Sequence, residues 1–121
     1  MMKLKLPKMR VPLFNCGTIY FCQSKQEWEA CFAAFNVVDR DNRPVSGSAT
    51  TLVNHTTGDT AYLLGVFNND VSTAAHEAAH VAFYICRDVG VTVSAEDSNE
   101  TFCYLVSNIM EFIGKTINKP E

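Results

Sequence analysis

Two histidines and a glutamate in the segment STAAHEAAHVAFY, residues 72–84, have the types and the spacing of a metal site. His76 and His80 are four residues apart, so on a helix they lie about 40° apart around the axis and one turn apart along it. Both imidazoles would therefore reach one ion from the same face. Glu77 is offset from that line by about 60° and would reach a water molecule on the metal. The segment predicts ligation by His76 and His80, with Glu77 as general base.

The pentapeptide HEAAH also occurs by chance in helices of unrelated proteins, so it does not identify a metal site by itself. From Ala74 to Cys86, however, the two histidines and the glutamate are the only charged or strongly polar residues. A buried helix without a metal would leave these three side chains without obvious partners, at a cost of several kcal/mol. A zinc ion would supply the partner. A metal-free α+β binding protein with an accidental HEAAH is the rival interpretation.

A second motif lies downstream, where Glu100 follows Asn99 and stands twenty residues after His80. HEAAH with this Asn-Glu pair resembles the zincin metallopeptidases, and among them the gluzincins such as thermolysin. The resemblance covers residues 72 to about 112. It implies Zn²⁺ as cofactor, His76, His80 and Glu100 as metal ligands, and Glu77 as the base that activates water.

Glu100 also has a structural interpretation, because the residues Asp97 to Glu100 have the pattern of a helix start with Glu100 at a capping position. Its position opposite the apolar stripe of that helix equally suits a solvated residue. If the connector before the helix bends differently, Glu96 is the substitute ligand.

The chain departs from the thermolysin pattern at residue 104. Thermolysin-like sequences carry an aspartate four residues after the ligand glutamate, where it orients a histidine, and this chain has Tyr104 there. A tyrosine hydroxyl one turn from Glu100 would orient His76 or bind the developing oxyanion. Tyr104 is therefore the second expected catalytic residue, beside Glu77. His55, next to a turn, is expected to be solvated.

The elements that would position these residues follow from residue periodicity and turn signals. We predict strands at 16–22, 48–55 and 60–67 and helices at 24–37, 72–89 and 98–116. Ser24 and Glu27 form a capping box at the start of the first helix, and Gly90 stands where the second should end. This order predicts an α+β fold. It would be a minimal zincin-like domain: a small, mostly antiparallel sheet, a backing helix, an active-site helix and a glutamate helix, with the metal between the last two.

Length and composition predict one domain over residues 1–121. The chain is 47% hydrophobic and 19% charged, with a formal net charge of −3. Four of its ten basic residues lie in the first ten positions, so we expect residues 1–12 to be a flexible basic leader. The rest is acidic, which argues against a nucleic-acid partner. No apolar run approaches the roughly 20 residues that cross a bilayer, so no membrane partner is expected.

Five cysteines without metal-site spacing favour reduced thiols and a cytoplasmic location. The expected function is that of a small zinc metallopeptidase acting on a peptide or protein substrate. That substrate would align along an exposed strand at 60–67 by β-addition. The alternative is a zinc-binding or protein-interaction module without catalysis. A compact acidic domain of this kind would suit a bacteriophage or bacterial accessory protein.

Overall fold

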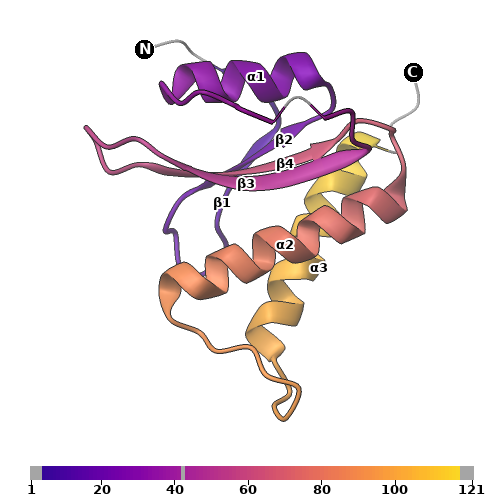
Figure 1. Cartoon of the computed structure of the whole chain (residues 1–121). Coiled ribbons are helices and arrows are strands. Elements are labelled where there is room, and N and C mark those ends of the chain that lie inside the picture. Colours follow the sequence, from indigo (N-terminus) through magenta and orange to yellow (C-terminus); the bar gives the residue numbers. More distant parts are fainter. Residues whose placement is uncertain (1–3, 42, 118–121) are drawn as a thin grey trace.

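The computed structural model describes residues 4–41 and 43–117. Four strands and three helices follow one another along this part of the chain (Figure 1). In chain order they are β1 (Lys8–Arg10), β2 (Thr18–Cys22), α1 (Lys25–Ala34), β3 (Gly47–Val53), β4 (Thr60–Val66), α2 (Val71–Val89) and α3 (Glu100–Ile117).

The strands form one mixed sheet with the spatial order β1-β2-β4-β3. β1 pairs antiparallel with β2, and β3 pairs antiparallel with β4. The two central strands, β2 and β4, run parallel, and α1 and β3 lie between them in the chain. A parallel pair needs such a long crossover, whereas β3 and β4 are joined by a short turn. The strands β1 and β3 are therefore the two edges of the sheet.

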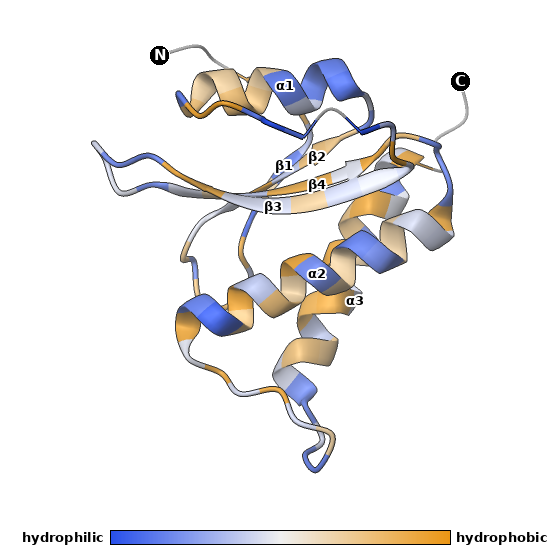
Figure 2. Cartoon of the chain, viewed as in Figure 1, coloured by the Kyte–Doolittle hydropathy of each residue, from blue (hydrophilic) through white to orange (hydrophobic). Residues whose placement is uncertain are grey.

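Helices cover both faces of the sheet, with α1 over one face and α2 and α3 over the other (Figure 1). Successive side chains of a strand point to opposite faces. Ala61 and Leu63 of β4 accordingly pack in the apolar cluster under α1, whereas Tyr62 and Leu64 pack in the larger cluster with α2 and α3. Figure 2 shows the apolar positions of α2 and α3 recurring between polar ones. β4 therefore contributes side chains to both apolar clusters.

Local signals set the helix ends. The Ser24 Oγ accepts a hydrogen bond from the backbone N–H of Glu27 at 3.1 Å, and the Glu27 carboxylate accepts one from the N–H of Gln23 at 2.7 Å. These bonds satisfy donors that a helix start leaves unpaired. Asp70 caps α2, and Gly90 ends it at a φ of 77°, a conformation that glycine adopts without strain. None of the helices in the described part is long and apolar enough to cross a membrane.

The predicted α+β class is confirmed, with two of the three strand pairs antiparallel. The three helices and three of the four strands lie close to the predicted ranges. The capping residues Ser24 and Gly90 act as expected. All five cysteines are free thiols, and three of them are buried.

The expectation of a flexible leader is wrong for residues 8–11. Lys8–Arg10 form β1, and Val11 is only 2% exposed. Lys8 and Arg10 are exposed while Met9 between them packs against the core. The charged residues thus belong to an edge strand with one apolar side chain facing inward. Residues 1–3 lie outside the described part of the chain.

The expectation of an exposed strand at 60–67 is also wrong. β4 lies between β2 and β3, and its residues 61–66 are all buried. Both of its backbone edges are used for pairing, so no peptide can be added to it. The exposed edge on the side of the HEAAH helix belongs to β3, which contacts α2.

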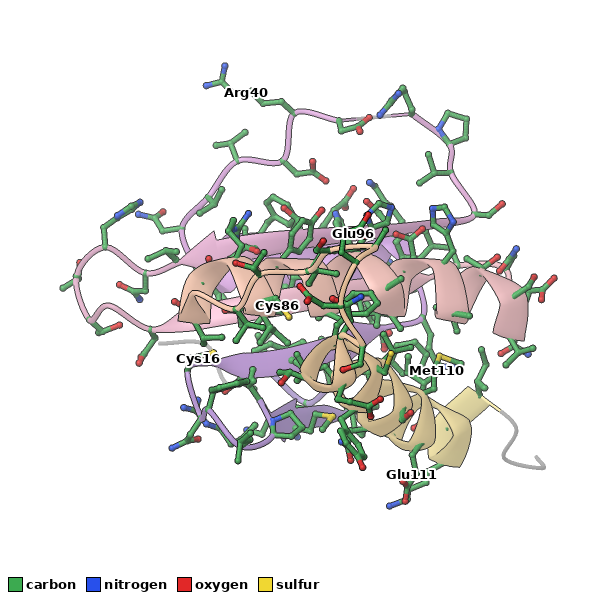
Figure 3. All side chains as sticks on the ribbon, turned by 90° about the horizontal axis from the view of Figure 1, so that it is seen from below. Cys16, Arg40, Cys86, Glu96, Met110 and Glu111 are labelled. Carbon is green, nitrogen blue, oxygen red and sulfur yellow. The ribbon has the colours of Figure 1, made fainter. Side chains whose placement is uncertain are left out.

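The segment between α1 and β3 runs along the outside of the molecule. Figure 3 shows the part that carries Arg40 extending away from the sheet and from α2. Asp39 ties the start of this segment to α1, because its carboxylate accepts hydrogen bonds from the Trp28 indole at 3.2 Å and from Lys25 at 3.4 Å.

Candidate metal centre

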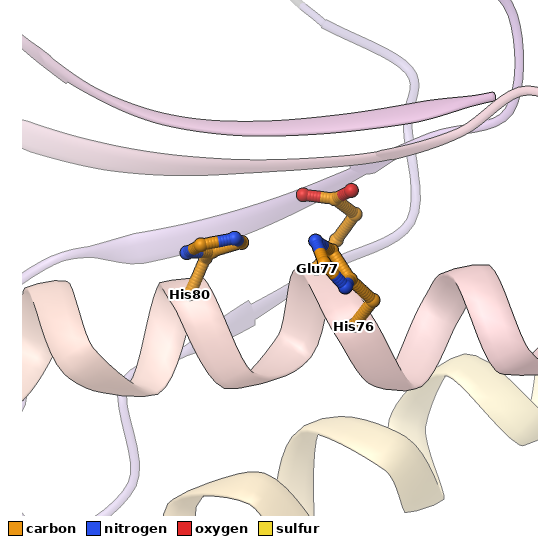
Figure 4. Close-up of side chains that lie close together, drawn as sticks. All are labelled: His76, Glu77 and His80. Carbon is orange, nitrogen blue, oxygen red and sulfur yellow. The ribbon is translucent and has the colours of Figure 1, made fainter. Parts of the chain in front are cut away.

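One face of α2 gathers His76, Glu77 and His80, which we call the His-Glu-His cluster. Each of the three offers one ligand atom, and these atoms all lie within 4.8 Å of one another. Figure 4 shows the three side chains rising from α2 toward the strands, whereas α3 passes on the other side of the helix. These side chains therefore do not point into the space between α2 and α3, where the metal was expected.

Helix periodicity explains this direction. The fully buried positions of α2, such as Ala78 and Ile85, face the core, while His76 and His80 lie about 140 to 180° away around the axis. Both histidines are exposed, and their ring centroids are 4.9 Å apart. Two neighbouring imidazoles with free nitrogens are an arrangement that suits a divalent metal ion.

Glu77 occupies the boundary between this exposed face and the core. It is 8% exposed and is the only buried charged residue in the described part of the chain. Burial raises the pKa of its carboxyl group, and the neighbouring His76 and His80 partly oppose that rise. A carboxylate with a raised pKa is a better proton acceptor near neutral pH than an ordinary glutamate.

Gly47, the first residue of β3, makes room for Glu77. A Cβ atom at position 47 would lie 3.1 Å from the Glu77 Cγ, 2.5 Å from the Thr73 Cγ2 and 2.8 Å from the Gly65 carbonyl oxygen. These distances leave no space for a side chain. Glycine at this position therefore lets α2 approach the edge of the sheet.

The cluster borders a shallow pocket at the start of β3. The pocket has a volume of about 360 Å³ and is lined by Ser46, Gly47, Ser72, Thr73, His76 and Glu77. It is polar and open, so water and an extended chain would have access to the cluster. The lining combines the N-terminal turns of α2 with the edge strand.

Tyr84 continues the same face one turn after His80. The two rings are nearly parallel, with an interplanar angle of 22° and centroids 6.4 Å apart. The Tyr84 hydroxyl donates a hydrogen bond of 3.4 Å to the carbonyl oxygen of Ala49 on β3. Arg87, three residues further along α2, lies over the Tyr84 ring, with its guanidinium carbon 5.1 Å from the ring centroid. His80, Tyr84 and Arg87 thus form a row on α2. Tyr84 thus lies between the His80 ring and the edge strand and contacts both.

Two partly exposed hydrogen bonds anchor the C-terminal end of α2 to the sheet. The hydroxyl of Tyr62 on β4 donates to the Asp88 carboxylate at 2.7 Å, and Arg87 donates to the same carboxylate at 2.9 Å. Burial raises the pKa of Asp88, but the two hydrogen bonds and the Arg87 charge together outweigh it, so its net pKa is lowered. Of the row His80, Tyr84 and Arg87, this network holds Arg87.

The structure does not bring Glu100 into the His-Glu-His cluster. Among the described residues, no group of metal-ligating side chains within 4.8 Å contains Glu100 or Glu96, and both are exposed. Asn99 explains the position of Glu100. Its side chain donates to the Ser94 and Asp97 carbonyl oxygens and its φ is 54°, which closes the connector and starts α3 at Glu100.

The first turn of α3 nevertheless lies against α2. Phe83, three residues after His80, contacts Phe102, two residues after Glu100, with ring centroids 4.5 Å apart. Glu100 is therefore placed at the start of the helix that packs next to the turn carrying His80. Its carboxylate remains on the solvent side.

Tyr104 is not at the cluster. It is 66% exposed and lines a different pocket, together with residues 12–14 of the segment after β1. On α3, position 104 faces that segment and solvent, so the expected orientation of His76 by Tyr104 has no support. Tyr84 is the tyrosine that contacts a histidine of the cluster. Its spacing of four residues from His80 was the available signal, whereas nothing in the sequence pointed to Gly47. His55 is exposed, as expected, in the turn between β3 and β4.

Comparisons with protein-family models, with curated proteins and with solved structures found no match for this chain.

Proposed function

We propose that this protein is a zinc-dependent hydrolase, a small metallopeptidase in which His76 and His80 hold the metal and Glu77 is the general base. The observation that carries the proposal is the convergence of ligand atoms from these three side chains within 4.8 Å at the edge of the exposed face of α2, next to the edge strand β3. The resemblance of HEAAH and Asn99-Glu100 to the gluzincin motifs agrees with it.

The donor set favours zinc. Two imidazoles and a carboxylate are ligands that zinc accepts at tetrahedral sites, and calcium or magnesium would require more oxygen ligands. A bound zinc ion supplies a Lewis acid that lowers the pKa of water and polarises a carbonyl group. The chain's own contribution is the position of Glu77. Its carboxylate oxygen takes the proton of the attacking water and passes it to the leaving amine nitrogen.

The edge of β3 supports a peptide as substrate. An extended chain can pair with an exposed strand through backbone hydrogen bonds. β3 runs beside the His-Glu-His cluster, and the Ala49 carbonyl oxygen already accepts a hydrogen bond from Tyr84 on α2. A peptide along this edge would pass the pocket between Ser46 and His76. We expect this work to take place in the cytoplasm, without nucleic acid or membrane as partner.

The third ligand separates this proposal from a second candidate. In the enzyme, as the gluzincin resemblance implies, Glu100 would complete the site, which requires it to move to the cluster from the solvent side of α3, and Glu77 stays free to act as base. In a zinc-binding module without catalysis, Glu77 itself is the third ligand. Glu77 belongs to the cluster and Glu100 does not, which favours this second candidate. The experiment therefore has to distinguish it from the enzyme.

The test measures zinc content and peptide cleavage in the same variants. Protein purified without a histidine tag should hold close to one zinc per chain, and His76→Ala and His80→Ala should lose most of it. In the enzyme, Glu77→Gln keeps zinc but slows cleavage of a susceptible peptide by roughly two to four orders of magnitude, whereas Glu100→Gln loses zinc. His55→Ala and Glu96→Gln are matched controls and should behave as the unmodified protein.

The opposite pattern identifies the rival. If Glu77→Gln loses zinc, Glu100→Gln keeps it and a broad peptide library is not cleaved, the protein is a binding module. If the protein holds no zinc and neither histidine variant changes metal content, the HEAAH motif is accidental.

A further inference from the structure

A pair of buried thiols lies on the other side of the sheet from the His-Glu-His cluster. The Sγ atoms of Cys22, at the end of β2, and Cys31, on α1, are 3.7 Å apart. Both residues are 0% exposed. No other pair of sulfur atoms in the described part of the chain makes such a contact. We propose that Cys22 and Cys31 form a reversible disulfide when the cell is exposed to peroxide, and that this bond fastens α1 to the sheet.

The positions of the two residues make the bond feasible without rearranging the fold. An S–S bond is about 2 Å long, so the sulfur atoms have to approach by less than 2 Å. Cys22 ends β2, which the sheet holds in place, and Cys31 faces it from the second turn of a short helix. Side-chain rotation and a small shift of α1 supply the approach.

The two thiols are not equivalent. The hydrogen bond with Cys22 lowers the pKa of Cys31, and the same contact raises the pKa of Cys22. A thiolate is the form that attacks a peroxide. Cys31 is therefore the sulfur that reacts first, and Cys22 is the one that resolves the product.

The reaction balances in two steps. The Cys31 thiolate attacks one oxygen of hydrogen peroxide, the O–O bond breaks, and a sulfenic acid and a hydroxide ion result; the hydroxide takes up the proton that Cys31 had released and becomes water. The Cys22 sulfur then attacks the Cys31 sulfur, the S–O bond breaks, and a second water leaves with the Cys22 proton. Two thiols lose two electrons in all, and hydrogen peroxide is reduced to two molecules of water.

Access to the thiols depends on α1. The helix has ten residues, which is too short to be stable alone, and it is the only helix on its face of the sheet among the described elements. Its buried anchors are Trp28 and Cys31. Local opening of α1 would admit a molecule as small as hydrogen peroxide, and the disulfide would then restrict that opening. The single tryptophan of the chain, Trp28, lies one turn before Cys31 and reports the event.

The experiment uses the Cys16→Ser/Cys103→Ser double variant, which removes the two cysteines that are not buried. After treatment with hydrogen peroxide, alkylation of the remaining thiols and trypsin digestion, peptide 11–25 should be linked to peptide 26–40. Since each peptide then holds one cysteine, the link is Cys22 to Cys31. The oxidised protein should melt about 5 to 15 °C higher than the reduced protein. Oxidation should also change the fluorescence of Trp28. A dithiol reductant should reverse the peptide link, the rise in melting temperature and the change in fluorescence.

Further variants decide the specificity. Cys31→Ala in the same background should abolish the link, whereas Cys86→Ala, at an equally buried thiol elsewhere, should leave it. If Cys31→Ala does not fold, the tryptic peptides of the Cys16→Ser/Cys103→Ser variant still show whether Cys22 and Cys31 are linked. Three alkylated thiols after peroxide treatment of the folded double variant, or a link that appears only after unfolding in urea, would overturn the proposal.

Discussion

The side chain of Glu77 lies against Gly47, so that a Cβ atom on residue 47 would be 3.1 Å from the Glu77 Cγ. This contact joins the edge of the sheet to the helix that carries both histidines. The only buried charged residue in the described part of the chain is therefore placed by a glycine on another element.

Gly47→Ala is expected to destabilise the protein by about 1 to 3 kcal/mol, the usual cost of forcing extra volume into a packed site. The new methyl group would meet the Gly65 carbonyl oxygen and the Thr73 side chain as well as Glu77. Zinc retention should fall at the same time, since α2 must move away from β3. Urea unfolding and metal analysis measure the two effects.

Gly114→Ala is the control, because a Cβ atom there would meet nothing within 4 Å. As an alanine inside α3 it should be neutral or stabilise by up to about 1 kcal/mol. Equal stability of Gly47→Ala and the unmodified protein would refute the described packing of Glu77.

Removal of zinc should lower the melting temperature. An ion that binds only the folded state stabilises it by mass action, by about 2.7 kcal/mol at a hundredfold excess over Kd. For a domain of this size the chelated protein should melt roughly 10 °C lower. Calorimetry with and without a chelator measures the shift. The His76→Ala/His80→Ala double variant should show no shift, and a shift of the same size in it would place the metal elsewhere.

Tyr84→Leu should weaken zinc binding about tenfold, because the aromatic ring stacked beside His80 is lost. Tyr84→Phe keeps the ring near His80 but removes the hydrogen bond to Ala49. It should therefore have an intermediate effect. Competition with a coloured chelator gives the Kd values. Unchanged binding in Tyr84→Leu would mean that the stacked ring does not orient His80.

Asp88→Asn should lower the free energy of unfolding by about 1 to 2 kcal/mol at pH 7, because Tyr62 and Arg87 lose their charged acceptor. The pKa of Asp88 is lowered in the folded protein, so its carboxylate stabilises the fold above the unfolded pKa of about 4. That stabilisation disappears as the pH falls through the folded pKa. Urea titrations should show that the free energies of unfolding of Asp88→Asn and the unmodified protein differ less at acid pH than at neutral pH.

Two controls accompany this measurement. Tyr62→Phe removes one donor and should destabilise by about 1 kcal/mol at neutral pH, whereas the exposed Asp97→Asn should have no effect. A difference between Asp88→Asn and the parent that is as large at acid pH as at neutral pH would contradict the role of the Asp88 charge.

The sequence was informative where the signal is local. Ser24 and Glu27 cap α1 through bonds within five residues, and Gly90 ends α2 through its own backbone freedom. The periodicity of α2 likewise placed His76 and His80 on one face. Each of these features depends on neighbours along the chain.

The misplaced features depend on contacts between distant segments. Three residues, Lys8–Arg10, are too few to show strand periodicity, and only their pairing with β2 makes them a strand. The central position of β4 follows from a parallel pairing across the crossover through α1 and β3. The direction of Glu100 is set by the turn that Asn99 closes. None of these relationships can be derived from residue types in one segment.

The short junction between β4 and α2 has a consequence for how the chain can vary in evolution. Gly47 pairs with Val66, the last residue of β4, and only residues 67–70 separate that strand from α2. One inserted residue there would displace the start of α2 from the strand edge, and one inserted within the helix before His76 would turn both histidines by about 100°. The outer segment that carries Arg40 has no such constraint (Figure 3). Relatives of this protein should therefore differ in length between α1 and β3, and should keep the spacing from the end of β4 to His76 unchanged.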